Sequence, residues 1–263
     1  MIIDVIDKKI RNAFSDAAMQ YDVLTSLHKE IGRELTKKVM GHEPCSAVLD
    51  IGMGTGWFTK RLTNIFPDAM VIGLDFADGM IQRAQQKGAD FEIVQADAAR
   101  LPFKEGTFDI ITSNLAYQWV GNLKQAFELC HNQLNKTGTL MITMFGKDTF
   151  HELFNALEHC ARNGEQRTGL AIQRLADKDQ VTEALKGAGF DKCEVSTEFI
   201  KVRFEDMMSL VKWVKDIGAN ALAKDIFMGK ELLLRTNDYY NARYRDRLGV
   251  YATFEIIWVE ARR

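Results

Sequence analysis

Residues 48–58 of the chain read Val48-Leu49-Asp50-Ile51-Gly52-Met53-Gly54-Thr55-Gly56-Trp57-Phe58, which predicts a short apolar strand, a glycine-rich turn and the start of a helix near Trp57. Glycines at alternate positions let the backbone bend tightly and approach a ligand where a Cβ atom would collide. A dinucleotide-binding fingerprint, G-x-G-x-x-G, would need its third glycine at position 57, where this chain has Trp57. The pattern present is D-x-G-x-G-x-G, and residues at fixed distances from it have to decide which ligand it serves.

The composition of the 263-residue chain is that of an ordinary globular protein, with 46% hydrophobic and 27% charged residues. The formal net charge of −2 gives no overall attraction to nucleic acid or to an anionic membrane. The four cysteines stand singly and indicate neither a metal site nor a disulfide framework. No apolar run reaches the ~18 residues of a membrane span, and acids follow Met1 where a signal peptide has bases. We therefore predict a cytoplasmic protein that binds no metal, nucleic acid or membrane.

An acidic side chain ends the next apolar strand, which we expect at 71–75. This residue, Asp75, lies 19 positions beyond Gly56. A carboxylate at the end of the second strand is placed to accept both hydroxyl groups of an adenosine ribose. Alternatively, Asp75 could cap the helix that begins near Asp78. We favour the ribose role, because the spacing of strand, acid and helix agrees with it.

Two further strands end in polar residues. A third strand and its exit, over 91–98, include Asp97 and Ala98, where a carboxylate suits the adenine amine and a backbone N–H suits a ring nitrogen. Asp97 could equally be a simple turn acid. The strand at 108–114 ends in Asn114, and Gln118 follows shortly after it. The glycine turn, Asp75, Asp97 and Asn114 all fall where strands end, and ligands of open α/β sheets bind beyond the carboxyl ends of the strands.

Between about residues 46 and 145, five apolar strands alternate with helices. This alternation predicts an α/β fold with a doubly wound parallel sheet. Before it, residues 5–40 have helical periodicity, with Tyr21 either a half-buried aromatic residue or a lid residue whose hydroxyl reaches the ligand. After it, we expect helices near 150–162, 179–188 and 204–234, and strands at 192–202 and 250–260. No linker divides the chain, so we predict one domain over 1–263, with a helical lid (1–40), a ligand-binding core (41–146) and a cap with closing strands (147–263).

Residues 48–146 resemble the core of the class I S-adenosylmethionine (SAM) methyltransferases. The resemblance implies a Rossmann-like, mostly parallel seven-stranded sheet with a helical cap, and SAM as the cofactor. It also implies the following cofactor-binding residues: Asp50, Gly52, Gly54, Gly56, Asp75, Phe76, Met80, Asp97, Ala98, Asn114 and Gln118.

Three segments are similar to a narrower group, the malonyl-acyl-carrier-protein O-methyltransferases of biotin synthesis. They are Phe14-x-x-Ala17-Ala18-x-x-Tyr21-Asp22, the stretch from Asn114 to Leu123, and the segment ending Lys215-Asp-Ile-Gly218-Ala219. This resemblance implies methyl transfer from SAM to the free carboxylate of malonyl-acyl-carrier protein or malonyl-CoA. Such a carboxylate is ionised at neutral pH and is itself the nucleophile, so placement and desolvation can suffice and no catalytic dyad is expected.

The substrate carboxylate still needs a clamp, and an arginine can hold one of its oxygens. We take Arg203, Tyr21 and His151 as candidates, with a surface arginine as the alternative for Arg203. Residues 201–247 hold 10 Lys/Arg and 7 Asp/Glu, which fits either a solvated helical face or a docking surface for an acidic carrier protein. The candidates for such docking are Lys212, Lys215, Arg243 and Arg245.

Two other functions remain open at this point. The chain could methylate another small acceptor, because the cap that would select the acceptor is poorly readable in sequence. It could also be a SAM-binding partner protein without transferase activity, since the glycine turn and Asp75 would serve that function as well. Nucleic-acid methylation is not indicated, because Asn114 is followed by Leu115-Ala116 and the chain has no basic surplus.

Overall fold

The computed structural model describes residues 2–42, 44–162, 175–219 and 229–263. The strands of the protein are β1 (Ala47–Ile51), β2 (Met70–Asp75), β3 (Glu92–Gln95), β4 (Phe108–Asn114), β5 (Leu134–Phe145), β6 (Lys192–Phe204), β7 (Arg245–Asp246) and β8 (Gly249–Arg262). The helices are α1 (Ile2–Leu24), α2 (Ser26–Val39), α3 (Trp57–Ile65), α4 (Asp78–Gln86), the 3₁₀ turn η1 (Tyr117–Trp119), α5 (Leu123–Gln133), α6 (His151–Arg162), α7 (Lys178–Gly187), α8 (Met207–Asp216) and α9 (Lys230–Arg243).

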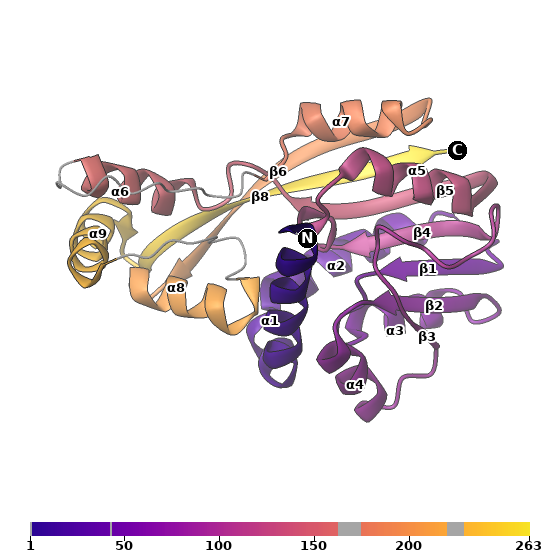
Figure 1. Cartoon of the computed structure of the whole chain (residues 1–263), viewed down its shortest axis with the longest axis horizontal. Coiled ribbons are helices and arrows are strands. Elements are labelled where there is room, and N and C mark those ends of the chain that lie inside the picture. Colours follow the sequence, from indigo (N-terminus) through magenta and orange to yellow (C-terminus); the bar gives the residue numbers. More distant parts are fainter. Residues whose placement is uncertain (1, 43, 163–174, 220–228) are drawn as a thin grey trace.

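A single sheet runs through the molecule in the order β3-β2-β1-β4-β5-β8-β6 (Figure 1). The five strands from β3 to β5 are parallel, whereas β8 and β6 are antiparallel to their neighbours. The two-residue β7 pairs with the start of β8 outside this order. The predicted mostly parallel, seven-stranded sheet is thus confirmed, with the short β7 added to it.

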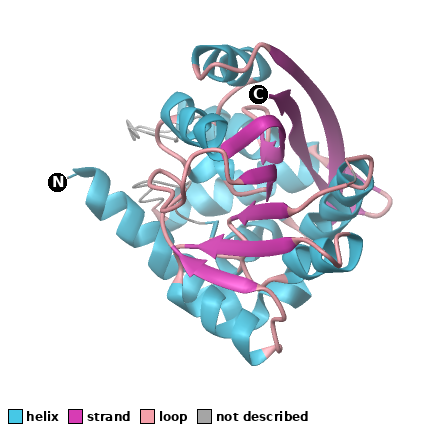
Figure 2. Ribbon diagram, turned by 90° about the vertical axis from the view of Figure 1, so that its right-hand side faces the viewer, coloured by secondary structure: helices cyan, strands magenta, loops and turns pink. Residues whose placement is uncertain are grey.

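Helices cover both faces of the sheet (Figure 2). Successive residues of β1 point to opposite faces, so Val48 joins a cluster with α2 and α3, and Leu49 joins another with α5 and α7. Both residues are fully buried. Burial on both sides explains why the parallel strands read as continuous apolar runs rather than alternating ones.

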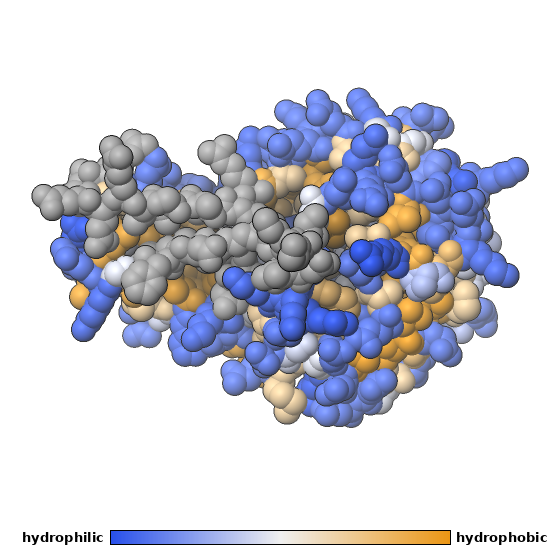
Figure 3. Space-filling view, viewed as in Figure 1, coloured by the Kyte–Doolittle hydropathy of each residue, from blue (hydrophilic) through white to orange (hydrophobic). Residues whose placement is uncertain are grey.

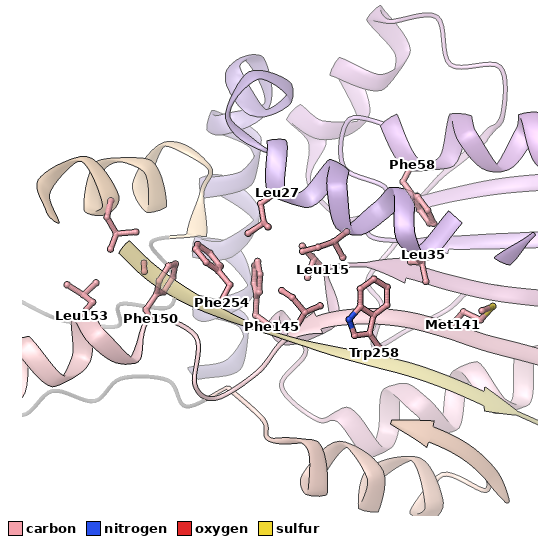
Figure 4. Packing of buried hydrophobic residues seen from close by; sticks show 14 of the residues in the cluster. Leu27, Leu35, Phe58, Leu115, Met141, Phe145, Phe150, Leu153, Phe254 and Trp258 are labelled. Carbon is pink, nitrogen blue, oxygen red and sulfur yellow. The ribbon is translucent and has the colours of Figure 1, made fainter. Parts of the chain in front are cut away.

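The antiparallel hairpin of β6 and β8 extends beyond the parallel strands. These two strands pair from Lys192 opposite Arg262 to Phe204 opposite Val250, whereas β5 pairs with β8 only as far as Ile256. Helices α6, α8 and α9 pack around the extension, at the left in Figure 1. One hydrophobic cluster continues from the core into this cap (Figure 4). Its members include Phe58, Phe145 and Phe254.

The N-terminal helix α1 contacts both the core and the cap. Helix α1 lies so close to α4 that a Cβ atom on Gly79 would stand 2.3 Å from the Ser15 carbonyl oxygen. The Arg11 Nε atom donates to the Phe76 carbonyl at 2.8 Å. On the cap side, the Trp213 indole of α8 donates to the Leu24 carbonyl at 2.8 Å. Helix α1 therefore contacts both parts of the molecule.

Some predicted boundaries differ from the structure. Strand β5 begins at Leu134, before the predicted start near 139. The turn expected at 135–138 is a register shift in the pairing of β5 with β4. The helix expected over 204–234 is not continuous: α8 ends at Asp216, just before Gly218 with φ of 80°, and α9 runs on to Arg243. Residues 220–228 of that prediction lie outside the described part. Within 91–98, where a strand and its exit were expected, residues 92–95 form the strand and pair with β2.

Polar residues dominate the outline of the face drawn in Figure 3, and apolar residues show between them. Among the described helices, none combines the length and the apolar character that crossing a bilayer requires. Within the same residues, no group of three or more His, Cys, Asp or Glu side chains could hold a metal ion. The division into lid, core and cap at residues 40 and 146 stays a prediction.

Candidate functional site

The glycine turn after β1 lies against the end of β2 and the loop after β4. The N–H groups of Gly52 and Met53 both donate to the Leu74 carbonyl, at 2.7 and 3.0 Å. Gly52 has φ of 76°, and a Cβ atom there would stand 2.3 Å from the Ala116 Cβ atom. Gly54 has φ of 56°. Both positions need a left-handed backbone, and Gly52 also needs the missing side chain, so the turn leaves its backbone open to a ligand.

The Asp75 carboxylate ends β2 and holds the glycine turn in place. It is 6% exposed, and its two oxygens accept the N–H groups of Gly54 at 2.8 Å and Ala77 at 2.9 Å. Burial raises the pKa of Asp75, while these backbone hydrogen bonds act against the rise. Ala77 is the N-cap residue of α4, so Asp75 binds the backbone at the start of this helix. This contact agrees in part with the alternative that Asp75 caps α4. Each carboxylate oxygen has a second lone pair, so the group can also accept a ribose hydroxyl.

A cavity of about 500 Å³, called the cofactor cavity below, opens beside the glycine turn and Asp75. It is lined by residues from α1, the carboxyl ends of β1, β2, β3 and β4, and the loop that leads to α5. The structure brings nine of the predicted site residues to this cavity: Tyr21, Gly52, Gly54, Asp75, Phe76, Met80, Asp97, Ala98 and Asn114. Its size is in the range of cavities that hold small ligands and cofactors.

A second, smaller cavity of about 50 Å³ adjoins the first. The two share Tyr21, Gly52, Gly54 and Asn114 in their linings. Asp50, predicted as a cofactor residue, lines only the smaller one. Its Oδ2 atom accepts the Thr59 hydroxyl at 2.6 Å, and burial raises the pKa of Asp50 to about 7.

Gly56 and Gln118, two other predicted cofactor residues, line neither of these cavities. A Cβ atom on Gly56 would stand 2.7 Å from the Phe91 Cζ atom, so this glycine allows close packing of the turn on its far side. The Gln118 amide donates to the Leu115 carbonyl at 2.8 Å and steadies the loop after β4. Both residues therefore support the loops that line the cavities and do not face the cavities themselves.

The structure does not bring Arg203 and His151 to Tyr21. Arg203 lies on the cap extension of β6, where its guanidinium pairs with the Asp246 carboxylate at 2.8 Å. The hydrogen bond and the negative charge of Asp246 raise the pKa of Arg203. His151 starts α6, and its Nδ1 atom lies 3.0 Å from the Asp148 carbonyl oxygen. Neither residue lines the cofactor cavity or the small cavity. Of the three candidates for the clamp, only Tyr21 therefore lines these cavities, because the hairpin carries Arg203 away from the parallel strands. The clamp itself stays a prediction.

Helix α1 is fastened to the glycine turn through Asp22. Its carboxylate accepts the Thr55 hydroxyl at 2.7 Å and the Lys87 ammonium at 2.8 Å. Burial alone would raise the pKa of Asp22, but these hydrogen bonds and the charges of Lys87 and Lys29 lower it below its usual value. Tyr21, the preceding residue, lines both cavities, and burial followed by the Asp75 and Asp22 charges raises its pKa. The Tyr21 hydroxyl is therefore a neutral hydrogen-bonding group at physiological pH.

Sequence reasoning missed part of the lining. Asp7, Ile10 and Phe14 of α1 face the cofactor cavity, and Phe14 meets Trp119 edge-on at 5.2 Å. Helical periodicity could have grouped these α1 residues on one face, but nothing in it indicated a ligand. Leu115 also lines the cavity, with the unusual φ of 56° for a residue other than glycine. Such backbone strain is common at functional sites, but it cannot be predicted from the presence of a leucine in the sequence.

The residues present fit an adenosine-containing cofactor. Gly52 supplies backbone that no Cβ covers, Asp75 supplies a buried acceptor, and Asp97 with Ala98 lines the wall beyond β3. The Asp97 carboxylate already accepts the Ala99 N–H at 2.8 Å, which fixes its direction. A nucleoside with a short charged tail would find acceptors at one end and the glycine turn at the other.

Solved structures share this fold. The YcgJ protein of Bacillus subtilis superimposes with a TM-score of 0.61 at 16% identity, over 88% of this chain and 98% of that one. A phosphoethanolamine N-methyltransferase 2 of Haemonchus contortus, solved with S-adenosylhomocysteine, superimposes with a TM-score of 0.54 at 18% identity, over 87% of this chain and 52% of that one. At these identities the likeness concerns the fold.

Sequence comparison narrows the assignment. Residues 49–142 match a family model described as a methyltransferase domain. The chain is 32% identical to a malonyl-[acyl-carrier protein] O-methyltransferase of Gallionella capsiferriformans, over 98% of this chain and 91% of the relative. The cofactor is SAM, in agreement with the residues that line the cavity. The chain therefore belongs to the malonyl-[acyl-carrier protein] O-methyltransferase family of SAM-dependent methyltransferases.

Proposed function

We propose that the protein transfers a methyl group from SAM to the free carboxylate of malonyl-acyl-carrier protein, as the name of its Gallionella relative implies for that enzyme. The observation that carries the proposal is identity of 32% over nearly the whole chain, which includes the cap as well as the cofactor core. A match confined to residues 49–142 would support methyl transfer alone. We also propose the step in biotin synthesis that the resemblance implied.

SAM, when bound, supplies an electrophilic methyl group on a sulfonium. The work left to this chain is to bind, orient and dry the acceptor. A malonyl carboxylate is ionised at neutral pH and needs no base, so its nucleophilicity rises when water is removed from it. The rings of Phe14, Tyr21 and Trp119 line the cavity and favour such exclusion of water. Effective placement of two reactants can itself account for a large part of a rate enhancement.

We propose that the cofactor is held by the backbone of the glycine turn, by Asp75 at its ribose and by Asp97 with Ala98 at its adenine. Support comes from the lining of the cavity and from the burial of Asp75. Gly56 and Gln118 support these groups from outside the cavity.

We propose that the carrier form of the substrate is preferred to malonyl-CoA. Lys212 and Lys215 lie on α8, which packs against α1, whose inner face lines the cavity. Arg243 and Arg245 lie at the far end of α9 and on β7, and Arg245 donates to the Glu205 carbonyl at 3.1 Å. Lys212 also has a partner, the Asp216 carboxylate on the same helix. The pair on α8 is the better candidate for meeting an acidic carrier because of its place beside α1, not because its charges are free.

The test is a methyl-transfer assay with SAM and, in parallel, malonyl-carrier protein, malonyl-CoA and free malonate. We expect S-adenosylhomocysteine and the methyl ester to form together, and faster with the carrier. Turnover with the carrier should fall between low salt and about 0.3 M salt, where screening is strong. A matched variant pair, Lys212→Ala with Lys215→Ala against Arg243→Ala with Arg245→Ala, locates the surface. Absence of methyl ester with all three malonyl compounds would contradict the proposed function.

A further inference from the structure

A buried histidine lies at the junction of lid, core and cap. His28 of α2 is 8% exposed, and within the described residues neither of its ring nitrogens has a hydrogen-bond partner. Its Nδ1 atom is wholly buried, so the nitrogen that a ligand in an adjoining cavity can reach is Nε2. Buried polar groups of native proteins are nearly always hydrogen-bonded, so an unpartnered imidazole in a pocket wall points to a ligand that completes it.

Three aromatic rings pack near this imidazole. The ring centroids of Tyr21 from α1, Phe145 from β5 and Trp213 from α8 lie 6.0, 5.7 and 6.4 Å away. Burial among them lowers the pKa of His28 to about 4. The imidazole is therefore neutral at physiological pH and offers one N–H donor and one acceptor.

His28 lines the small cavity of about 50 Å³, together with Tyr21, Lys29 and Asp50. Since a water needs a cavity of only about 10–15 Å³ on this measure, the space admits a small polar group such as a carboxylate. The Tyr21 hydroxyl and the remaining N–H groups of Lys29 are donors, and Asp50 is the nearby acid. The Lys29 ammonium is held by the Asp22 backbone carbonyl and lies 3.9 Å from the Asp22 carboxylate.

We propose that the His28 N–H, together with the hydroxyl of Tyr21 from the same cavity wall, binds a ligand carboxylate in this small cavity. The carboxylate comes either from the methionine end of the cofactor or from the acyl group of the acceptor, and the second source rests on the proposed function. The small cavity shares four wall residues with the cofactor cavity, so either group can reach it. The neutral His28 and Tyr21 donors orient the carboxylate, and the Lys29 ammonium in the same wall, already held by Asp22, adds positive charge beside it.

The test compares ligands with and without the carboxylate in two variants. His28→Phe keeps a flat ring and removes the donor, and His28→Gln restores an amide donor. Calorimetry gives the affinity ratio of S-adenosylhomocysteine to 5′-methylthioadenosine, which lacks the amino-acid end. Competition assays give the affinity ratio of malonyl-CoA to acetyl-CoA. His131→Phe serves as the matched control, because that ring packs on Phe190 on the other face of the sheet.

We expect one of the two ratios to fall at least tenfold in His28→Phe, to recover in His28→Gln and to stay at the wild-type value in His131→Phe. A fall in the first ratio identifies the cofactor carboxylate, and a fall in the second identifies that of the acceptor. Wild-type ratios in a folded His28→Phe variant would overturn the proposal, and so would the same fall in His131→Phe. If His28→Phe does not fold, His28→Leu is judged by the same criteria. A wild-type protein that forms no methyl ester refutes the proposed function alone, because the first ratio does not depend on turnover.

Discussion

Replacing Gly52 by alanine tests whether the glycine turn is shaped by steric closeness as well as by backbone conformation. The added Cβ atom would stand 2.3 Å from the Ala116 Cβ atom. Ala116 has no flexible side chain to move, so the backbone of one of the two loops must shift. Both loops line the cofactor cavity, and their separation therefore sets its shape.

The size of the effect has two parts. A residue other than glycine in the left-handed region costs about 1–2 kcal/mol. Forcing an extra carbon into a packed site adds about 1–3 kcal/mol. Gly88 separates the two, because its φ of 74° is nearly that of Gly52, at 76°, but no atom lies within 4 Å of its ideal Cβ position. Gly88→Ala should therefore show the first part alone.

Urea unfolding of both variants measures the free energy of unfolding, and calorimetry with S-adenosylhomocysteine measures cofactor affinity. We expect Gly52→Ala to lose about 2–5 kcal/mol of stability, against about 1–2 kcal/mol for Gly88→Ala. We also expect affinity to fall at least tenfold in Gly52→Ala only. Equal destabilisation of both variants, with normal affinity in Gly52→Ala, would refute the reasoning.

Four further variants or conditions give independent checks. In Asp75→Asn, calorimetry should show a loss of about 2 kcal/mol in S-adenosylhomocysteine binding, roughly thirtyfold, because a charged acceptor is lost. Asp22→Asn breaks the ion pair with Lys87, so stopped-flow release of S-adenosylhomocysteine should speed up roughly two- to fivefold and lose its salt dependence. Arg203→Ala should leave the KM for the malonyl substrate unchanged, since its guanidinium pairs with a cap carboxylate; a large rise would return it to the site. Burial lowers the pKa of His28 from 6.5 to about 4, so unfolding takes up a proton between these values. Stability measured by urea unfolding should therefore rise with pH across that window by up to about 3 kcal/mol, and this rise should be absent in His28→Gln.

The cofactor core could be predicted because its signals are local. A glycine with positive φ can hardly be another residue, so Gly52 and Gly54 mark the turn wherever the rest of the chain lies. Parallel strands bring their carboxyl ends to one edge, and this rule alone placed Asp75, Asp97 and Asn114 together. Boundaries were less secure: the register shift that lets β5 start at Leu134 depends on its pairing with β4.

The acceptor side could not be predicted in the same way. Arg203 and Tyr21 are both plausible carboxylate ligands by residue type, and only the length of the β6–β8 hairpin separates them. His28 was one of five scattered histidines with no special spacing. It acquires its environment from Tyr21, Phe145 and Trp213, whose positions depend on how three distant segments pack.

This difference follows from the chemistry of the proposed reaction. A carboxylate that needs no base leaves no acid–base pair in the sequence, so residues that choose the acceptor are selected for shape, dryness and neutral donors. Such residues look like ordinary core positions. Tyr21, which is partly buried, and His28, which is buried, are of this kind, and both are uncharged at physiological pH. If acceptor choice is set by these residues, substitutions of Tyr21 or His28 should alter the KM for the acceptor and the substrate preference. The affinity for S-adenosylhomocysteine should instead change in variants of the glycine turn and Asp75.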